Sequence, residues 1–285
     1  MPEDSAQELF VSLTCLSGDA DLYISTTPGP TKDDHVWGQT RWGSDAITIY
    51  PEDQNFCSGC YYFISVYGFE EAIYTILASV KSDEPSILYP GMPQADHVSE
   101  SGVNNYAFEF VRSSRDSNAE SEQITVSLTP SFGDPDIFVL VSDATGEGGN
   151  GGRGHPSPTN WDYYSLELNQ RQDRVVIDTN NPKFNTLCPL VSDMCLIQVA
   201  ITGFHESDYV LTVTTNRAIT TLAIDQPFQG VVARRAYDYF KVAVATLQSS
   251  LKLALSPTAG SSELYVSCTN EYPSYKVDEH EFTSS

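Results

Sequence analysis

Apolar and polar residues alternate along most of this chain, in short runs that turn residues separate. A period of two places apolar side chains on one face of a β-strand. The clearest runs are residues 10–14, 46–50, 61–67, 73–78, 106–111, 125–129, 175–178, 195–201 and 209–213. No stretch holds a helical period of useful length. The pattern therefore predicts strands and turns throughout.

One motif occurs three times and sets the organisation of the chain. Gly18-Asp19-Ala20-Asp21 returns as Gly133-Asp134-Pro135-Asp136, and more loosely as Gly260-Ser261-Ser262-Glu263. The glycines are 115 and 127 residues apart, and each motif follows a similar predicted strand, at 10–14, 125–129 and 252–256. A repeat of that length is a domain rather than a short structural repeat.

We therefore expect an all-β fold of three tandem units, each an antiparallel β-sandwich. The units span residues 1–80, 86–215 and 217–285. Only the second carries every predicted strand, because the first lacks the opening strands and the third lacks the closing ones. One complete and two partial sandwiches result.

Four of the six cysteines stand before equivalent strands of the first two units. Cys57 and Cys60 precede the run at 61–67, and Cys188 and Cys195 precede and begin the run at 195–201. The two pairs share a turn but differ in spacing, which favours disulfides over a zinc site, since zinc needs further Cys or His ligands near by. Disulfides indicate an extracellular or cell-surface location. Cys15 and Cys268 are left over, to pair with each other, with another chain or not at all.

The charge of the chain excludes some partners. Fifteen basic and 38 acidic residues give a formal net charge of −23. That field repels nucleic acid and anionic lipid, and it favours divalent cations or basic partners. The longest apolar runs are too short to span a bilayer, so we expect no membrane insertion.

The order of these landmarks resembles the bacterial pre-peptidase C-terminal domain family. The matching segments are residues 106–111, 134–138, 158–159, 195–201, 203 and 209–213. The resemblance implies a jelly-roll-like sandwich that serves secreted proteins as a non-catalytic appendage, and some such domains bind calcium, collagen or polysaccharide. The third copy departs from the family pattern, with Ser261 and Glu263 in place of the two aspartates.

Two sets of residues are candidates for ligand binding. The first comprises Asp19 and Asp21, and Asp134 and Asp136, where residues two apart on a strand share a face. Each pair fits a calcium ion, which prefers several oxygen ligands, or hydrogen bonds to the neighbouring loop. The second set is aromatic and surrounds one loop in each unit: Trp37, Trp42, Trp161, Tyr163 and Tyr164. These rings suit stacking on a polysaccharide, contact with a protein partner, or packing of the loop.

We do not expect an enzyme. The five histidines lie in five separate segments, and no nucleophile-elbow motif accompanies them. The favoured function is a structural or adhesive repeat protein, which forms a head-to-tail filament or surface array from its own copies or joins neighbouring repeats of a longer chain. The alternative is a calcium-dependent accessory module that binds polysaccharide or matrix.

Overall fold

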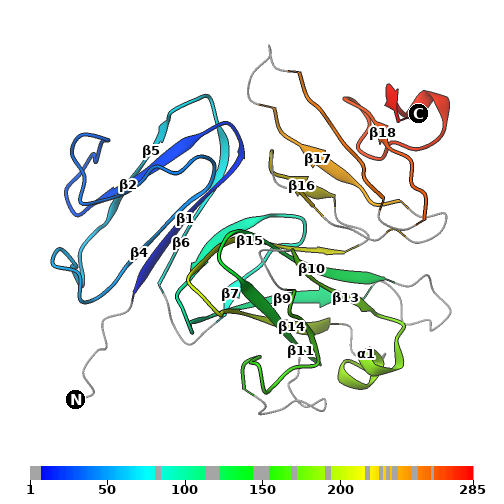
Figure 1. Ribbon diagram of the computed structural model, residues 1–285, viewed down its shortest axis with the longest axis horizontal. Coiled ribbons are helices and arrows are strands. Elements are labelled where there is room, and N and C mark those ends of the chain that lie inside the picture. Colours follow the sequence, from blue (N-terminus) through cyan, green and yellow to red (C-terminus); the bar gives the residue numbers. More distant parts are fainter. Residues whose placement is uncertain are drawn as a thin grey trace.

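The computed structural model is nearly all β, which confirms the predicted fold class (Figure 1). It describes residues 8–80, 85–112, 122–143, 154–167, 172–189, 194–215, 219–224, 227–228, 232, 237–244, 250–257 and 260–284. We call residues 8–80 the first unit, 85–215 the second and 219–284 the third. In Figure 1 the first unit lies at the left, the second at the lower right and the third at the upper right.

The first unit is a sandwich of two three-stranded sheets. Its strands are β1 (Leu9–Ser17), β2 (Ala20–Ser25), β3 (Trp37–Gln39), β4 (Asp45–Ile49), β5 (Phe63–Gly68) and β6 (Ile73–Val80). They form sheets of order β4-β1-β6 and β3-β2-β5, with all pairs antiparallel. Val11, Leu13, Leu22 and Ile24 are fully buried between the sheets, as the alternation of their strands predicts.

The second unit has the same arrangement with three more strands. Its elements are β7 (Ser86–Ile87), β8 (Gln94–Val98), β9 (Val103–Val111), β10 (Gln123–Phe132), β11 (Pro135–Asp143), β12 (Tyr163–Ser165), β13 (Asp173–Asp178), α1 (Pro182–Leu187), β14 (Met194–Gly203) and β15 (Ser207–Thr215). The sheets have the orders β13-β10-β15-β8 and β12-β11-β14-β9-β7. One core cluster lies between them.

The first and second units share their strand register. The corresponding sets are Leu13 opposite Asp45 and Ile76, and Leu128 opposite Asp173 and Leu211. Even the irregularity of the central strand recurs, between Cys15 and Ser17 in β1 and between Pro130 and Phe132 in β10. Strands β1 to β6 are thus equivalent to β10 to β15. The second unit adds β7, β8 and β9 at the sheet edges.

The third unit departs from the sequence-based prediction. Its described elements are β16 (Thr220–Leu222), β17 (Phe240–Val242), β18 (Tyr265–Val266), a 3₁₀ turn (Val277–Glu279) and β19 (Phe282–Thr283). Residues 252–256, predicted as a strand, form none, and Leu253 and Leu255 are exposed. In the other units the equivalent strand lies between two neighbours, whereas here no described strand supplies the pairing that would stabilise it.

Candidate functional site

Three buried aspartates form a cluster at one end of the first unit. Asp19 and Asp21 belong to the repeated motif, and Asp45 begins β4. Asp19 Oδ1 accepts a hydrogen bond from the Gly43 amide at 2.8 Å, and Asp45 Oδ1 accepts one from the Arg41 amide at 3.0 Å. The cluster thereby fixes the loop that leads into β4.

Burial raises the pKa of a carboxyl group in this cluster. Burial, together with the nearby charges of Asp21 and Asp19, raises the pKa of the Asp45 carboxyl to about 7, while the hydrogen bond from the Arg41 amide acts in the opposite direction. Asp45 is 1% exposed, and its Oδ2 has no hydrogen-bond partner in the structure. A proton on Asp45 therefore relieves both the repulsion and the desolvation of the carboxylate.

The second unit repeats the cluster with Asp134, Asp136 and Asp173. Burial, followed by the charges of Asp173 and Asp134, raises the pKa of Asp136 to about 6. Burial likewise raises the pKa of Asp173. Asp173 Oδ1 accepts a hydrogen bond from the Glu167 amide at 2.9 Å, and its buried Oδ2 has no hydrogen-bond partner in the structure. The two units therefore hold the same loop in the same way.

Our sequence reading found two members of each cluster and missed the third. Asp45 stands two residues before Ile47, and Asp173 stands two residues before the equivalent Val175; that shared position was the available signal. Within the described residues, no group of three or more His, Cys, Asp or Glu side chains is arranged to hold a metal ion. Calcium binding at the motif aspartates stays a prediction.

The aromatic candidates divide into inward and outward positions. Trp37 packs against the first core, and its Nε1 donates to Asp53 Oδ2 at 3.2 Å. Tyr163, at the equivalent position, packs against the second core beneath Lys183, whose Nζ lies 4.4 Å from the ring centroid. Loop packing thus accounts for both of these residues.

Three aromatic candidates remain at the surface. Trp42 is 68% exposed, the highest value of the set. Trp161 and Tyr164 are partly exposed, with ring centroids 4.3 Å apart. These side chains present apolar rings to solvent, Trp42 on the first unit and the other two on the second.

Both predicted disulfides are present. Cys57 is bonded to Cys60 and Cys188 to Cys195, each pair with 5.9 Å between Cα atoms. Cys15 and Cys268 are free thiols, the first buried and the second exposed. One disulfide therefore closes the turn before β5, and the other links the end of α1 to the start of β14.

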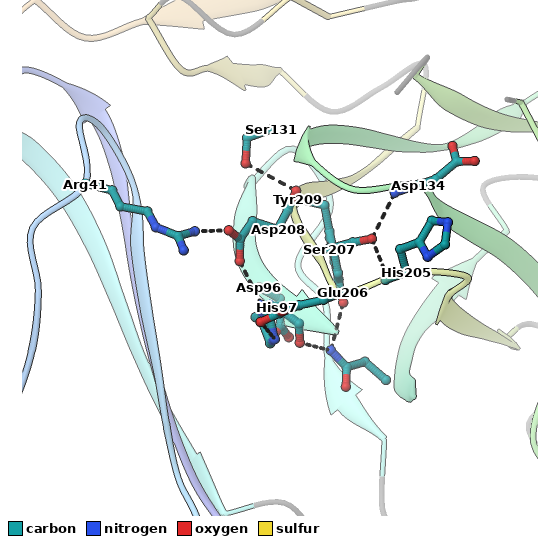
Figure 2. A network of polar contacts seen from close by, with 11 residues as sticks. Arg41, Asp96, His97, Ser131, Asp134, His205, Glu206, Ser207, Asp208 and Tyr209 are labelled. Atoms are coloured by element: carbon teal, nitrogen blue, oxygen red, sulfur yellow. Dashed lines mark hydrogen bonds and ion pairs between the residues drawn. The ribbon is translucent and has the colours of Figure 1, made fainter. Parts of the chain in front are cut away.

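A contact that sequence reasoning did not foresee joins the first two units. Figure 2 shows Arg41, from the loop before β4, reaching across to Asp208 of β15, with which its guanidinium forms an ion pair. The other carboxylate oxygen of Asp208 lies 2.8 Å from His97 Nδ1. His97 Nε2 in turn lies 3.6 Å from Glu206 Oε1. One arginine of the first unit thus contacts a cluster of polar side chains on the second unit, formed by His97, Glu206 and Asp208.

Close by, strand β1 of the first unit packs on edge strand β8 of the second. Ser12 Oγ donates to the Ala95 carbonyl at 2.5 Å, and Thr14 Oγ1 accepts from the Ala95 amide at 2.9 Å. Ser12, Thr14 and Ala95 are all buried. Two hydroxyls therefore satisfy both backbone polar groups of one residue, Ala95, at the edge of a sheet.

The third unit contains a shallow hollow of about 470 Å³. Its lining residues are Tyr237, Tyr239, Asn270, Tyr272, Ser274, Tyr275, Lys276 and Glu279. Tyr237 and Tyr239 stack at 5.8 Å, and Tyr272 meets Tyr239 edge-on. Aromatic walls with a few polar groups are a usual chemistry for sugar recognition.

Comparison with known proteins adds little to this description. No protein-family model matches the chain, and no curated protein matches it. The pre-peptidase C-terminal domain of a collagenase from Bacillus anthracis is similar over 47% of this chain and 98% of that one, at 10% identity and a TM-score of 0.28. The family that the sequence resembles is thus among the structural neighbours, and membership stays a resemblance.

Two further solved structures are similar over longer stretches. The match to a structure of the Gx strain of infectious bursal disease virus covers 73% of this chain and 54% of the viral chain, at 6% identity and a TM-score of 0.19. The PBSX exported protein XepA covers 73% of this chain and 76% of its own, at 14% identity and a TM-score of 0.18. Scores this low carry no argument about function.

Proposed function

We propose that this chain is a non-catalytic extracellular structural repeat protein, whose sandwich units stack on one another within the chain and between copies. The observation that carries the proposal is the pair of hydrogen bonds between the side chains of Ser12 and Thr14 and the backbone of Ala95, which we call the seal on Ala95. Ser12 and Thr14 of one unit hydrogen-bond the backbone carbonyl and amide of Ala95, an edge-strand residue of the next. Unit-to-unit contact is thereby built into the hydrogen bonding of the sheets.

The sheet edges that stay uncovered support contact between copies. An exposed edge presents unpaired N–H and C=O groups, which pair with any strand offered to them. Among the described residues, β5 pairs with β2 alone and β6 with β1 alone. These two strands therefore offer edges to a partner, as do β3 and β4 at the other ends of the two sheets.

The covalent chemistry of the chain fits an extracellular setting. Two disulfides close turns of the first and second units. Disulfides persist in oxidising compartments and are rare in the cytosol. Within the residues that the structure describes, no helix has the length and apolar character to cross a membrane.

The test is the state of assembly of the purified chain. Sedimentation velocity and negative-stain electron microscopy would be run over a hundredfold range of concentration. We expect end-to-end chains or filaments that grow with concentration. Monodisperse single molecules at every concentration would overturn the proposal.

A second function, calcium-dependent binding of polysaccharide or matrix, is favoured by the twin carboxylate clusters together with the exposed pair Trp161 and Tyr164. Calcium should raise the melting temperature of the wild type relative to chelator, and the double variant Asp21→Asn/Asp136→Asn should abolish the rise. Asp33→Asn, on an exposed loop, is the control. Identical melting in calcium and chelator would exclude the calcium site.

A further inference from the structure

The first unit leaves part of its own core face uncovered. Tyr74 on β6 stands opposite Cys15, as Tyr209 on β15 stands opposite Pro130. Tyr209 is 1% exposed, whereas Tyr74 is 43% exposed. The next core-facing residue repeats the contrast, since Leu211 is fully buried and Ile76 is 45% exposed. Side chains that belong to a sandwich interior thus face solvent.

In the second unit, β9 covers this face. It pairs along its whole length with β14, with Tyr106 opposite Val199. The Tyr106 hydroxyl lies 2.7 Å from that of Tyr209, and it also bonds the Asp96 carboxylate. The first unit has the equivalent of β14, which is β5, with Ile64 at the position of Val199. Among the described strands, none lies in the place of β9.

The third unit contains a strand of the missing kind. In the second unit β7 runs parallel to β9, with Ser86 opposite Tyr106. In the third unit β16 runs parallel to β17, with Thr220 opposite Phe240. Taking Thr220 as the counterpart of Ser86 places Phe240 at the position of Tyr106. These two are the only parallel pairs among the described strands, which makes the equivalence specific.

We propose that β17 of a second copy pairs with the open edge of β5 and completes a five-stranded sheet, of order β3-β2-β5-β17-β16, equivalent to β12-β11-β14-β9-β7. Among the described residues, β17 pairs with β16 alone and so has a free edge. Phe240 is 39% exposed and Val244 is 41% exposed. These apolar side chains would cover Tyr74 and Ile76. The proposal rests on the proposed function, because it names the surfaces through which copies associate.

Charge favours a second copy as the partner. Residues 1–80 contain twelve acidic and two basic residues. Residues 217–257 contain two acidic and five basic residues, in a chain whose net charge is −23. The segment that carries β17 is thus a basic part of an acidic protein. Opposite charge steers two surfaces together and selects against other contacts.

A cysteine trap tests the pairing residue by residue. In a Cys268→Ser background, one protein carries Ile64→Cys and the other Phe240→Cys. Directly opposed residues on paired antiparallel strands have Cα atoms about 4.5–5.5 Å apart, within the span of a disulfide, so mild oxidation can join them. We expect the mixed dimer to exceed either self-dimer at least tenfold. Ser65→Cys is the matched control, because the neighbouring residue points to the opposite face.

A charge variant supplies an independent measurement. Lys241 is exposed on β17, so Lys241→Glu should weaken association at least tenfold in sedimentation. Lys183→Glu, on α1 of the second unit and with the same change in net charge, should not. Association of the wild type without the mixed disulfide, and with no effect of Lys241→Glu, would overturn this pairing and leave the proposed function standing. A chain that does not associate at all would overturn both. Mixed dimers no more abundant than those of Ser65→Cys would equally count against the pairing.

Discussion

Gly18 lies so close to the carbonyl oxygen of Glu71 that a Cβ atom would be 2.0 Å from it. Gly133 of the second unit is equally close to a backbone carbonyl, because a Cβ atom there would be 2.4 Å from the carbonyl oxygen of Glu206. Both glycines have positive φ, 75° and 81°. The glycine of the repeated motif thus lets the turn before β2 or β11 pass against the turn before β6 or β15.

The third copy of this glycine provides an internal comparison. Gly260 has φ of 71°, yet nothing lies within 4 Å of a Cβ there. We predict that Gly260→Ala costs about 1–2 kcal/mol for the left-handed backbone alone. Gly133→Ala must also displace backbone and should cost more than ~3 kcal/mol. Chemical denaturation measures both, and equal losses would contradict the close approach as the reason for glycine.

Asp45 makes stability depend on pH in a specific direction. Its folded pKa of about 7 exceeds the unfolded value of about 3.9. The folded state therefore binds this proton more tightly, and the stabilisation is complete below about pH 4 and is lost as the pH rises to about 7. Asp45→Asn keeps the side-chain shape and should lose less stability over that interval than the wild type. Urea denaturation at a series of pH values measures this, with Asp33→Asn as the control; parallel curves for wild type and Asp45→Asn would refute it.

The two free cysteines should differ in reactivity. Burial raises the pKa of the Cys15 thiol to about 11, and the charges of Asp45, Asp19 and Asp21 add to the effect. Thiolate is the reactive form, so Cys15 is protected by both access and protonation. At pH 8, alkylation of the native protein followed by mass spectrometry should modify Cys268 and spare Cys15. Urea should expose both, and rapid native labelling of Cys15 would count against the described packing.

The seal on Ala95 predicts a local loss of protection. Thr14→Val keeps the shape of the side chain and leaves the buried Ala95 amide without its acceptor, at a cost of about 1–3 kcal/mol. Hydrogen exchange of that amide should accelerate. Thr48→Val, on the neighbouring strand β4, is the control. Unchanged exchange at Ala95 would show that Thr14 is not its acceptor in solution.

The strands that pair within the first two units could be predicted from the sequence, whereas the third unit could not. Alternation identified β1, β10 and their partners because one face of each is buried. It wrongly predicted a strand at residues 252–256, because that pattern persists in the sequence while no strand among the described residues pairs with it. Tyr74 is a similar case. The alternation of β6 predicts that its side chain faces the core, but the sequence does not reveal that no described strand covers it.

The candidate site shows a similar division. The motif aspartates were recognisable by repetition, and Asp45 and Asp173 were not, because they join the cluster only when β4 and β13 pair with the central strands. The contact of Arg41 with Asp208 joins residues 167 positions apart. No local pattern marks such a pair. Tertiary packing alone brings them together.

Spacing between equivalent residues shows where the sandwich accepts extra chain. Leu13 and Leu128 are 115 positions apart, Trp37 and Tyr163 are 126 apart, and Ile76 and Leu211 are 135 apart. Asp45 and Asp173 are 128 apart, so the longer second unit has gained its residues mainly after β11 and after β13, outside the sheets. The matching loops of the first unit, at residues 26–36 and 50–62, are where a dye, an affinity tag or a foreign peptide can be inserted with least cost to folding.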